Sequence, residues 1–377
     1  MKKQILFLVL CLFLLAPLSI KAAILFLLPQ SQSVYQGESF FVEVRLDTEG
    51  EEINAAGVAL KFPSDFLEVI DFNKGDSIFS LWPEEANIKE GEISFLAGVP
   101  GGFREEGLIG RINFFGKKTG EARITFKEDS NVLLNDGSGT PAKLNFLEGN
   151  YAIEEKSPDL PKISSSSHPN QNKWYSQNSL NLHWDLINGA EYSYLLSSSS
   201  SDSPDEIPDK SEGELIWMGD MEYADLKDGI YYFTLKQKLA GKEWSKRVIF
   251  RAMVDSTVPE KFKSEIGQDP SVFGGKYFLS FSTTDKLSGI DHYEVKEGNK
   301  DFKEVKSPYV LEDQNLRGKI IVKAIDKAGN EQISEIKPQI KPFPYYILIL
   351  GLIILVIFWF IFRKIRKNQK KESNKNS

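Results

Sequence analysis

Residues 37–46 read Gly-Glu-Ser-Phe-Phe-Val-Glu-Val-Arg-Leu, and this stretch shows the pattern that decides the fold. Positions 40, 42, 44 and 46 are apolar, which is the period of a β-strand with one buried face. Four more short runs of this kind follow, each bounded by Gly, Asn, Asp or Pro, at Val58–Phe62, Glu92–Leu96, Arg111–Phe115 and Arg123–Lys127. No part of residues 23–154 keeps a 3.6-residue period. We therefore predict an all-β sandwich here.

The N-terminus has the layout of a secretory signal peptide. A basic start precedes twelve apolar residues at 5–16, and small residues, Ala22 and Ala23, follow. We predict a signal peptide at 1–22, with an uncleaved N-terminal anchor as the alternative. Cleavage would remove Cys11, the single cysteine, and a mature chain without cysteine is compatible with export.

The C-terminus has the pattern of a membrane anchor. Residues 345–362 carry no charge, and eighteen helical residues reach about 27 Å, close to the roughly 30 Å of a bilayer core. The fifteen residues that follow carry seven Lys or Arg and one acid. We predict a transmembrane helix at 343–362 and a cytoplasmic tail at 363–377. The protein would then be a single-pass type I membrane protein whose bulk is extracellular.

The charge balance bears on the class of partner. The whole chain has a net charge of −7, and residues 23–362 hold 36 basic and 52 acidic residues, a net charge of −16. A field of this sign repels phosphate backbones, so we expect no nucleic-acid partner.

Two further modules are expected after the first. A Pro- and Ser-rich linker is predicted at 155–172, followed by strand-rich blocks at 173–256 and 257–340. The two blocks echo each other, because Gly229 and Ser245 have the same spacing as Gly318 and Ser334. We infer two related β-sandwich modules.

Residues 23–154 resemble a cohesin domain along their whole length. The resemblance is carried, in order, by Tyr35–Leu46, Ile53–Leu60, Phe62–Val69, Gly91–Phe95, Gly110–Phe114, Gly120–Ile124 and Asn135–Gly139. It implies a nine-stranded jelly-roll sandwich, similar in structure to some carbohydrate-binding modules. It also implies a receptor role, since cohesins in cellulosomes dock the calcium-loaded dockerins of secreted enzymes.

The later blocks resemble fibronectin type III or bacterial Ig-like repeats. Their carriers are Asp228–Phe233 with Trp244-Ser245 in the first, and Asp326–Asn330 after the strand Lys319–Ile325 in the second. This resemblance implies spacers on a cell surface.

The pattern departs from that of a cellulosomal scaffold. The chain has one cohesin-like module, and no duplicated calcium loop of the dockerin type is present in the sequence. We expect a non-catalytic, membrane-anchored binding protein that engages a dockerin-like protein, in connection with polysaccharide degradation. The alternatives are direct carbohydrate binding by this module and a structural adhesin or stalk.

Catalytic motifs do not support an enzyme. The sequence has no nucleophile elbow, zinc-protease motif, P-loop or dinucleotide fingerprint. The lone Ser334–Lys337 matches S-x-x-K without companion motifs. The histidines, His168, His183 and His292, are too widely spaced for local metal ligation.

Calcium is the one candidate ion, and no other cofactor is predicted. Three turns place carboxylate and amide oxygens together: Asn135 with Asp136, Asp285 with Asp291, and Asp326 with Asn330. The alternative is that Asp and Asn are simply what turns require.

Three aromatic residues in loops are candidates for stacking on a ligand. They are Phe79, Trp82 and Phe103. Exposed, clustered rings would bind sugars, whereas rings that cap the open end of the sandwich would belong to its core.

Overall fold

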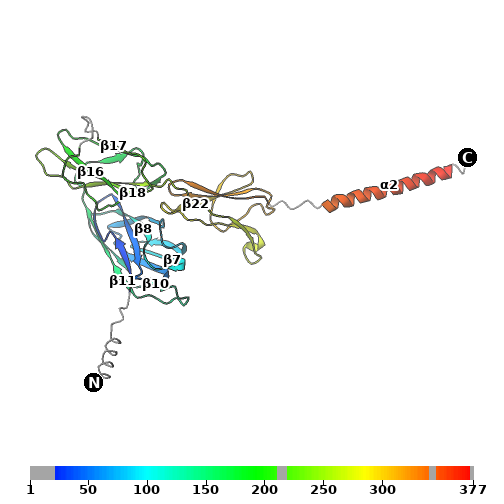
Figure 1. The fold of residues 1–377 in the computed structure, drawn as a ribbon, viewed down its shortest axis with the longest axis horizontal. Coiled ribbons are helices and arrows are strands. Elements are labelled where there is room, and N and C mark those ends of the chain that lie inside the picture. The colour runs from blue at the N-terminus through cyan, green and yellow to red at the C-terminus, as the bar shows by residue number, and fades with distance from the viewer. Residues whose placement is uncertain (1–21, 210–218, 339–344, 374–377) are drawn as a thin grey trace, which may run out of the picture.

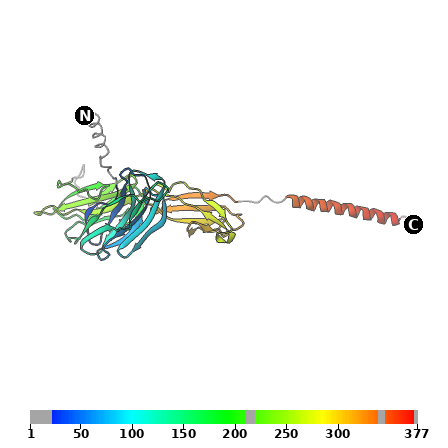
Figure 2. The ribbon, with the colours of Figure 1, turned by 90° about the horizontal axis from the view of Figure 1, so that it is seen from below.

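The computed structural model describes residues 22–209, 219–338 and 345–373. They form three β-sandwich modules and the helix α2 (Tyr345–Ser373). Modules 1 and 2 lie side by side, module 3 adjoins both, and α2 extends away from them (Figures 1 and 2). Residues 1–21 of the predicted signal peptide lie outside the described residues.

Module 1 (residues 23–154) consists of two packed sheets. The first contains β1 (Ala23–Leu28), β3 (Ser39–Asp47), β5 (Leu67–Asn73), β8 (Glu106–Gly116) and β11 (Leu144–Leu147), in the order β11-β1-β3-β8-β5. The second contains β2 (Ser31–Tyr35), β4 (Ile53–Lys61), β6 (Leu81–Lys89), β7 (Glu92–Phe103), β9 (Gly120–Phe126), β10 (Asn131–Leu134) and β12 (Gly149–Glu154). Its order is β2-β12-β9-β4-β7-β6, and β10 also pairs with β4. Module 1 thus has twelve strands, whereas the cohesin resemblance implies nine.

The core of module 1 follows from the alternation in β3. Phe40, at 3% exposure, points inward with the side chains at 42, 44 and 46. Its ring lies 6.0 Å from that of Phe114 and 5.2 Å from that of Tyr151, both of which are fully buried. The Tyr151 hydroxyl donates a hydrogen bond to the carbonyl of Pro29 at 2.8 Å, which satisfies its polar end, and burial raises its pKa. The all-β prediction is confirmed.

Modules 2 and 3 are smaller sandwiches of three plus four strands. Module 2 contains β13 (Ile163–Ser165), β15 (Leu180–Trp184) and β17 (Asp220–Tyr223), against β14 (Trp174–Tyr175), β16 (Glu191–Ser197), β18 (Gly229–Lys238) and β19 (Val248–Val254). Module 3 contains β20 (Glu265–Gln268), β21 (Tyr277–Ser280) and β24 (Tyr309–Val310), against β22 (Ile290–Glu297), β23 (Lys303–Val305), β25 (Ile320–Asp326) and β26 (Glu331–Ile336). A short 3-10 turn, η1 (Phe273–Gly275), precedes β21.

The four-stranded sheets of the two smaller modules share the order of three strands. They run β14-β19-β18-β16 and β23-β22-β25-β26, so β18 lies between β16 and β19 as β25 lies between β22 and β26, while the fourth strand flanks β19 in one sheet and β22 in the other. Gly229 begins β18 and Gly318 lies just before β25, so the repeated Gly-to-Ser spacing of the sequence starts at these two strands. Residues 163–165 of the predicted linker 155–172 form β13, the first strand of module 2, which pairs with β15.

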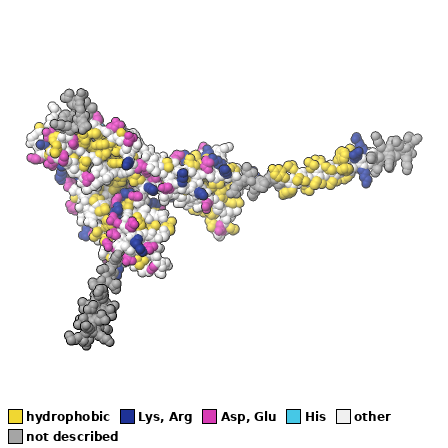
Figure 3. Space-filling model, in the orientation of Figure 1, with side chains coloured by type: hydrophobic (Ala, Val, Ile, Leu, Met, Phe, Trp, Pro, Cys, Tyr) yellow, Lys and Arg dark blue, Asp and Glu magenta, His cyan; other side chains and the backbone are white. Residues whose placement is uncertain are grey.

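The helix α2 begins at Tyr345 and ends at Ser373. Figure 3 shows apolar side chains along it and basic side chains beyond them. No helix among the described residues is both long and apolar enough to cross a membrane. The predicted span at 343–362 begins in residues 339–344, which lie outside the described part of the chain.

Modules 2 and 3 pack on one outer face of module 1. Phe41 of β3 points away from the core of module 1 and forms a buried cluster with Trp174 and Met253 of module 2. Leu287 and Ala328 of module 3 pack against the same cluster. The outer face of β3, β5 and β8 is therefore covered.

Candidate functional site

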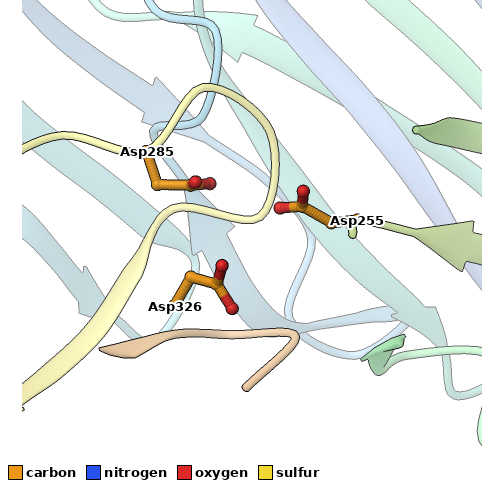
Figure 4. Close-up of side chains that lie close together, drawn as sticks. All are labelled: Asp255, Asp285 and Asp326. Carbon is orange, nitrogen blue, oxygen red and sulfur yellow. The ribbon is translucent and has the colours of Figure 1, made fainter. Parts of the chain in front are cut away.

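Three buried carboxylates meet where modules 2 and 3 join. Asp255 directly follows β19, Asp285 lies in the loop between β21 and β22, and Asp326 ends β25. Their exposed fractions are 1%, 8% and 2%, and one oxygen of each lies within 4.8 Å of the others. Figure 4 shows the three carboxylates pointing toward one another.

Local turns fix the orientation of each carboxylate. Asp285 Oδ1 accepts the backbone N–H groups of Leu287 at 3.1 Å and Gly289 at 2.8 Å. Asp326 Oδ1 accepts those of Ala328 at 2.9 Å and Asn330 at 2.8 Å. Such Asx turns hold a carboxylate against its own backbone and leave the second oxygen free to face elsewhere.

A cross-module hydrogen bond completes the arrangement. The backbone N–H of Ser288 in module 3 donates to Asp255 Oδ2 of module 2 at 3.0 Å. The side-chain amide of Asn330 donates to the carbonyl of Asp255 at 2.8 Å and to Asp326 Oδ2 at 2.9 Å. The three acids are thus held together by polar contacts from both modules.

The cluster lacks a protein cation. Burial, together with the neighbouring carboxylate of Asp285, raises the pKa of Asp255, and burial together with Asp255 raises the pKa of Asp326. The nearby lysines pair elsewhere: Lys286 with Glu260 at 3.9 Å, and Lys327 with Asp71 of module 1 at 2.6 Å. None of the ion pairs in the described part of the chain includes the three acids.

The geometry suits a calcium ion. Calcium binds oxygen at about 2.4 Å, so two oxygens that share an ion lie no more than about 4.8 Å apart, and it takes 6–8 oxygen ligands. One oxygen of each acid satisfies that limit, so the three carboxylates supply three of the oxygen ligands that the ion takes. Magnesium prefers to keep several waters and fewer carboxylates, which fits this dry, acidic site less well.

The cluster also lies next to module 1. The side-chain amide of Asn73, in β5, donates to the carbonyls of Leu287 at 3.3 Å and Ser288 at 3.1 Å. Ser288 is the residue whose N–H binds Asp255. A single loop of module 3 therefore links the acidic cluster to both of the other modules.

The structure unites parts of two predicted calcium turns and separates the rest. Asp285 and Asp326 come together, with Asn330 as a hydrogen-bond donor beside them. Asp291 is exposed and pairs with His292 at 2.7 Å. Asn135 and Asp136 lie in a separate loop of module 1. Asp255 was not predicted, because its only signal in the sequence is an acid directly after the mostly apolar strand β19.

The three predicted stacking aromatics lie against the core of module 1. Phe79 is 3% exposed and belongs to that core. Trp82 and Phe103 are partly buried and pack on it, with Trp82 at 5.6 Å from Phe95. The structure does not bring the three rings together on one exposed surface. Ligand stacking by Trp82 or Phe103 stays a prediction.

The outer face of the second sheet of module 1 is flat and built from small side chains. Four cross-strand pairs of β4 and β7 point outward: Ala55 with Gly98, Gly57 with Leu96, Ala59 with Ser94, and Lys61 with Glu92. The intervening residues, such as Val58 and Phe95, fill the core. Beside this face, Leu81 of the edge strand β6 is 53% exposed.

Comparisons with known proteins give structural likenesses only. No family model and no curated protein matches the chain. A cohesin from Acetivibrio cellulolyticus scaffoldin B, solved with a mutant dockerin, is 17% identical, with 36% of this chain and 100% of that one covered and a TM-score of 0.32. A non-cellulosomal cohesin from the archaeon Archaeoglobus fulgidus is 16% identical, with 36% and 93% covered and a TM-score of 0.31. A cohesin from Clostridium acetobutylicum is 12% identical, with 37% and 94% covered and a TM-score of 0.32.

Proposed function

We propose that the chain is a non-catalytic binding protein whose cohesin-like module 1 engages a protein partner through the flat outer face of β4 and β7. One observation carries this proposal: modules 2 and 3 pack on the outer face of β3, β5 and β8, whereas Glu92 and Ser94 on the outer face of β7 are exposed. Ser94 is exposed on this face, and Leu96 and Leu81 add apolar contact area. The cohesin resemblance of the sequence favours a dockerin-like partner.

The remaining parts of the proposal rest on the sequence. A signal peptide at 1–22 and an apolar segment at 343–362 favour an exported protein held at the cell membrane, with modules 2 and 3 as spacers. The cohesin resemblance favours a connection to polysaccharide degradation. Direct carbohydrate binding and a stalk role are the competing proposals.

Binding of the full chain to immobilised, calcium-loaded dockerins and to a glycan array tests these alternatives. Ser94→Arg places a long charged side chain on the proposed face, and Ser164→Arg makes the same change on β13 of module 2, where the side chain is also exposed. We expect dockerin binding that Ser94→Arg weakens at least tenfold and Ser164→Arg leaves unchanged. Glycan retention without dockerin binding would favour the carbohydrate proposal, and retention of neither would favour the stalk.

We also propose that Asp255, Asp285 and Asp326 bind one calcium ion that fixes modules 2 and 3 to each other. The supporting observation is that three buried acids from both modules converge, and none of them forms an ion pair with a cation of the described residues. The ion would offset the repulsion among the three carboxylates by coordinating all of them. The orientation of module 1 relative to modules 2 and 3 would then depend on calcium. Titration calorimetry with calcium and with magnesium tests the site, with Asp285→Asn as the variant that removes one ligand.

A further inference from the structure

A large cleft runs between modules 1 and 2, away from the calcium site and from the flat face. Its volume is about 1190 Å³. Its walls are β2 and the turn to β3 in module 1, residues 169–172, the serine-rich loop at 200–203, and the β19 side of module 2. A cleft of this size is larger than most small-molecule pockets, which range from about 300 to 1,000 Å³, and it has room for a segment of a polymer.

A buried arginine lines the cleft with part of its guanidinium group unpaired. Arg251 is 3% exposed. Its Nη2 donates to Ser39 Oγ at 3.0 Å and to Asn172 Oδ1 at 2.5 Å, and its Nε donates to the carbonyl of Gln171 at 3.0 Å. The guanidinium carbon lies 4.2 Å from the centre of the Phe41 ring. Its Nη1 is buried and has no hydrogen-bond partner among the described residues.

The charge of this arginine is not balanced by a carboxylate. Within the described residues no acid forms an ion pair with Arg251 or with Arg247, which lies four residues earlier and also lines the cleft. Arg247 Nη1 donates to the backbone carbonyl of Asp202, and the charge of Asp202 offsets part of the effect of burial, which lowers the pKa of Arg247. Of the lining acids, Glu38 pairs with Lys156 at 2.6 Å and Glu154 with Lys246 at 2.7 Å, and the third is Glu121. A buried cation without an anion costs several kcal/mol, so an external anion would be strongly favoured here.

The spacing of the two arginines indicates the length of the ligand. Four residues of an extended strand span about 13 Å. Carboxylates at positions i and i+4 of an extended peptide have the same separation, so one such peptide matches both guanidinium groups.

The opposite wall of the cleft offers a strand edge. In the described part of the chain, β2 is an outermost strand of its sheet and pairs with β12 alone. All five of its residues, 31–35, line the cleft, and the buried Oε1 of Gln32 lacks a hydrogen-bond partner. An unpaired strand edge is a template for an extended peptide, whose N–H and C=O groups continue the ladder. This edge favours a peptide over a sugar acid.

We propose that this cleft binds an extended acidic peptide of a partner protein, which adds to the edge of β2 and places two carboxylates on Arg251 and Arg247. A carboxylate beside Arg251 would neutralise the buried charge. The site is separate from the flat face of β4 and β7, so the chain would hold two partners at once.

Fluorescence anisotropy with the full chain tests the proposal. The probe is a labelled ten-residue peptide of Ser, Thr and Val with Asp at positions 3 and 7, and the control peptide has Asn at both positions. The variants are Arg247→Gln, Arg251→Lys, which keeps the charge but loses the planar fork, and Arg104→Gln as a matched control on an exposed arginine paired with Glu52. Thermal melting checks that each variant is folded.

We expect the acidic peptide to bind at least tenfold more tightly than the control peptide. Arg247→Gln and Arg251→Lys should each weaken binding at least tenfold, and Arg104→Gln should leave it unchanged. Equal binding of the two peptides, no binding of the acidic one, or an unchanged Kd in Arg247→Gln would overturn the proposal. Binding of a galacturonic-acid oligomer in place of the peptide would overturn the peptide assignment and give the cleft to a sugar acid.

Discussion

Replacing Asp255 by Asn distinguishes a calcium site from an ordinary acidic turn, because the two hypotheses predict opposite changes in the free energy of unfolding. Asn keeps the size of the side chain and an oxygen that can accept the N–H of Ser288. Two ionised carboxylates at 4.8 Å repel by about 3.5 kcal/mol at an effective dielectric constant of 20. Loss of one charge removes two of the three repulsive pairs. Since partial protonation already relieves part of the repulsion, we expect the calcium-free variant to be about 1–2 kcal/mol more stable than the wild type.

Calcium should reverse this order. With a Kd of about 10⁻⁴ M, as in extracellular calcium modules, about 10 mM calcium stabilises the folded wild type by about 2.7 kcal/mol. For a unit of 150–250 residues this raises Tm by roughly 5–10 °C. The variant has lost one ligand and should gain little. The wild type should therefore be the less stable protein in a chelator and the more stable protein in calcium.

Differential scanning calorimetry of both proteins, in chelator and in calcium, measures the four stabilities. Ser256→Ala changes the adjacent residue outside the cluster and controls for a general effect on this turn. Two results would refute the reasoning: a wild-type Tm that does not respond to calcium, or a variant that is also less stable in chelator. Either would show that the three acids are held by their turns alone.

Three further predictions follow from the same contacts. The pKa values of Asp255 and Asp326 are raised in the folded protein, so their contribution to the free energy of unfolding is present below about pH 4 and is lost as the pH rises through the raised values. The calcium-free wild type should therefore gain stability relative to Asp255→Asn as the pH falls from 7 to 4. Urea unfolding at each pH measures this difference. Phe114→Ala, at a fully buried ring of module 1, should cost about 3–5 kcal/mol in urea unfolding, whereas Ser94→Ala should cost little. Asn73→Ala leaves the carbonyls of Leu287 and Ser288 without their donor and should cost about 1–3 kcal/mol; faster hydrogen exchange in the 285–289 loop would report it, and unchanged exchange would show that this contact does not hold module 3.

The sandwich folds could be predicted because the signal for each strand is local. In β3 the alternation of residues 40–46 is enough to assign the buried face, and the structure buries Phe40 and Val42 as that pattern requires. The exception within β3 is Phe41, an apolar residue at an outward position. In an isolated sandwich it would be exposed, yet it is 9% exposed because Trp174 and Met253 of module 2 cover it. An apolar residue out of phase with its strand was therefore the one sequence signal of a module contact.

The acidic cluster and the arginine cleft could be predicted only in part, and for a common physical reason. Asp285 and Asp326 could be identified as candidates because Asx turns are encoded within five residues of sequence. Asp255 and Arg251 gain their meaning from burial against another module, which no local pattern specifies: Arg251 lies 212 residues from Ser39, to which it donates a hydrogen bond. A solvated Asp or Arg is compatible with most surface positions, so neither residue stands out in the sequence. Burial without a counter-charge carries a desolvation cost, and this cost favours the binding of an external ion. The ion would be a cation at Asp255 and an anion at Arg251. The contacts that join the modules are thus the same contacts that create both proposed binding sites.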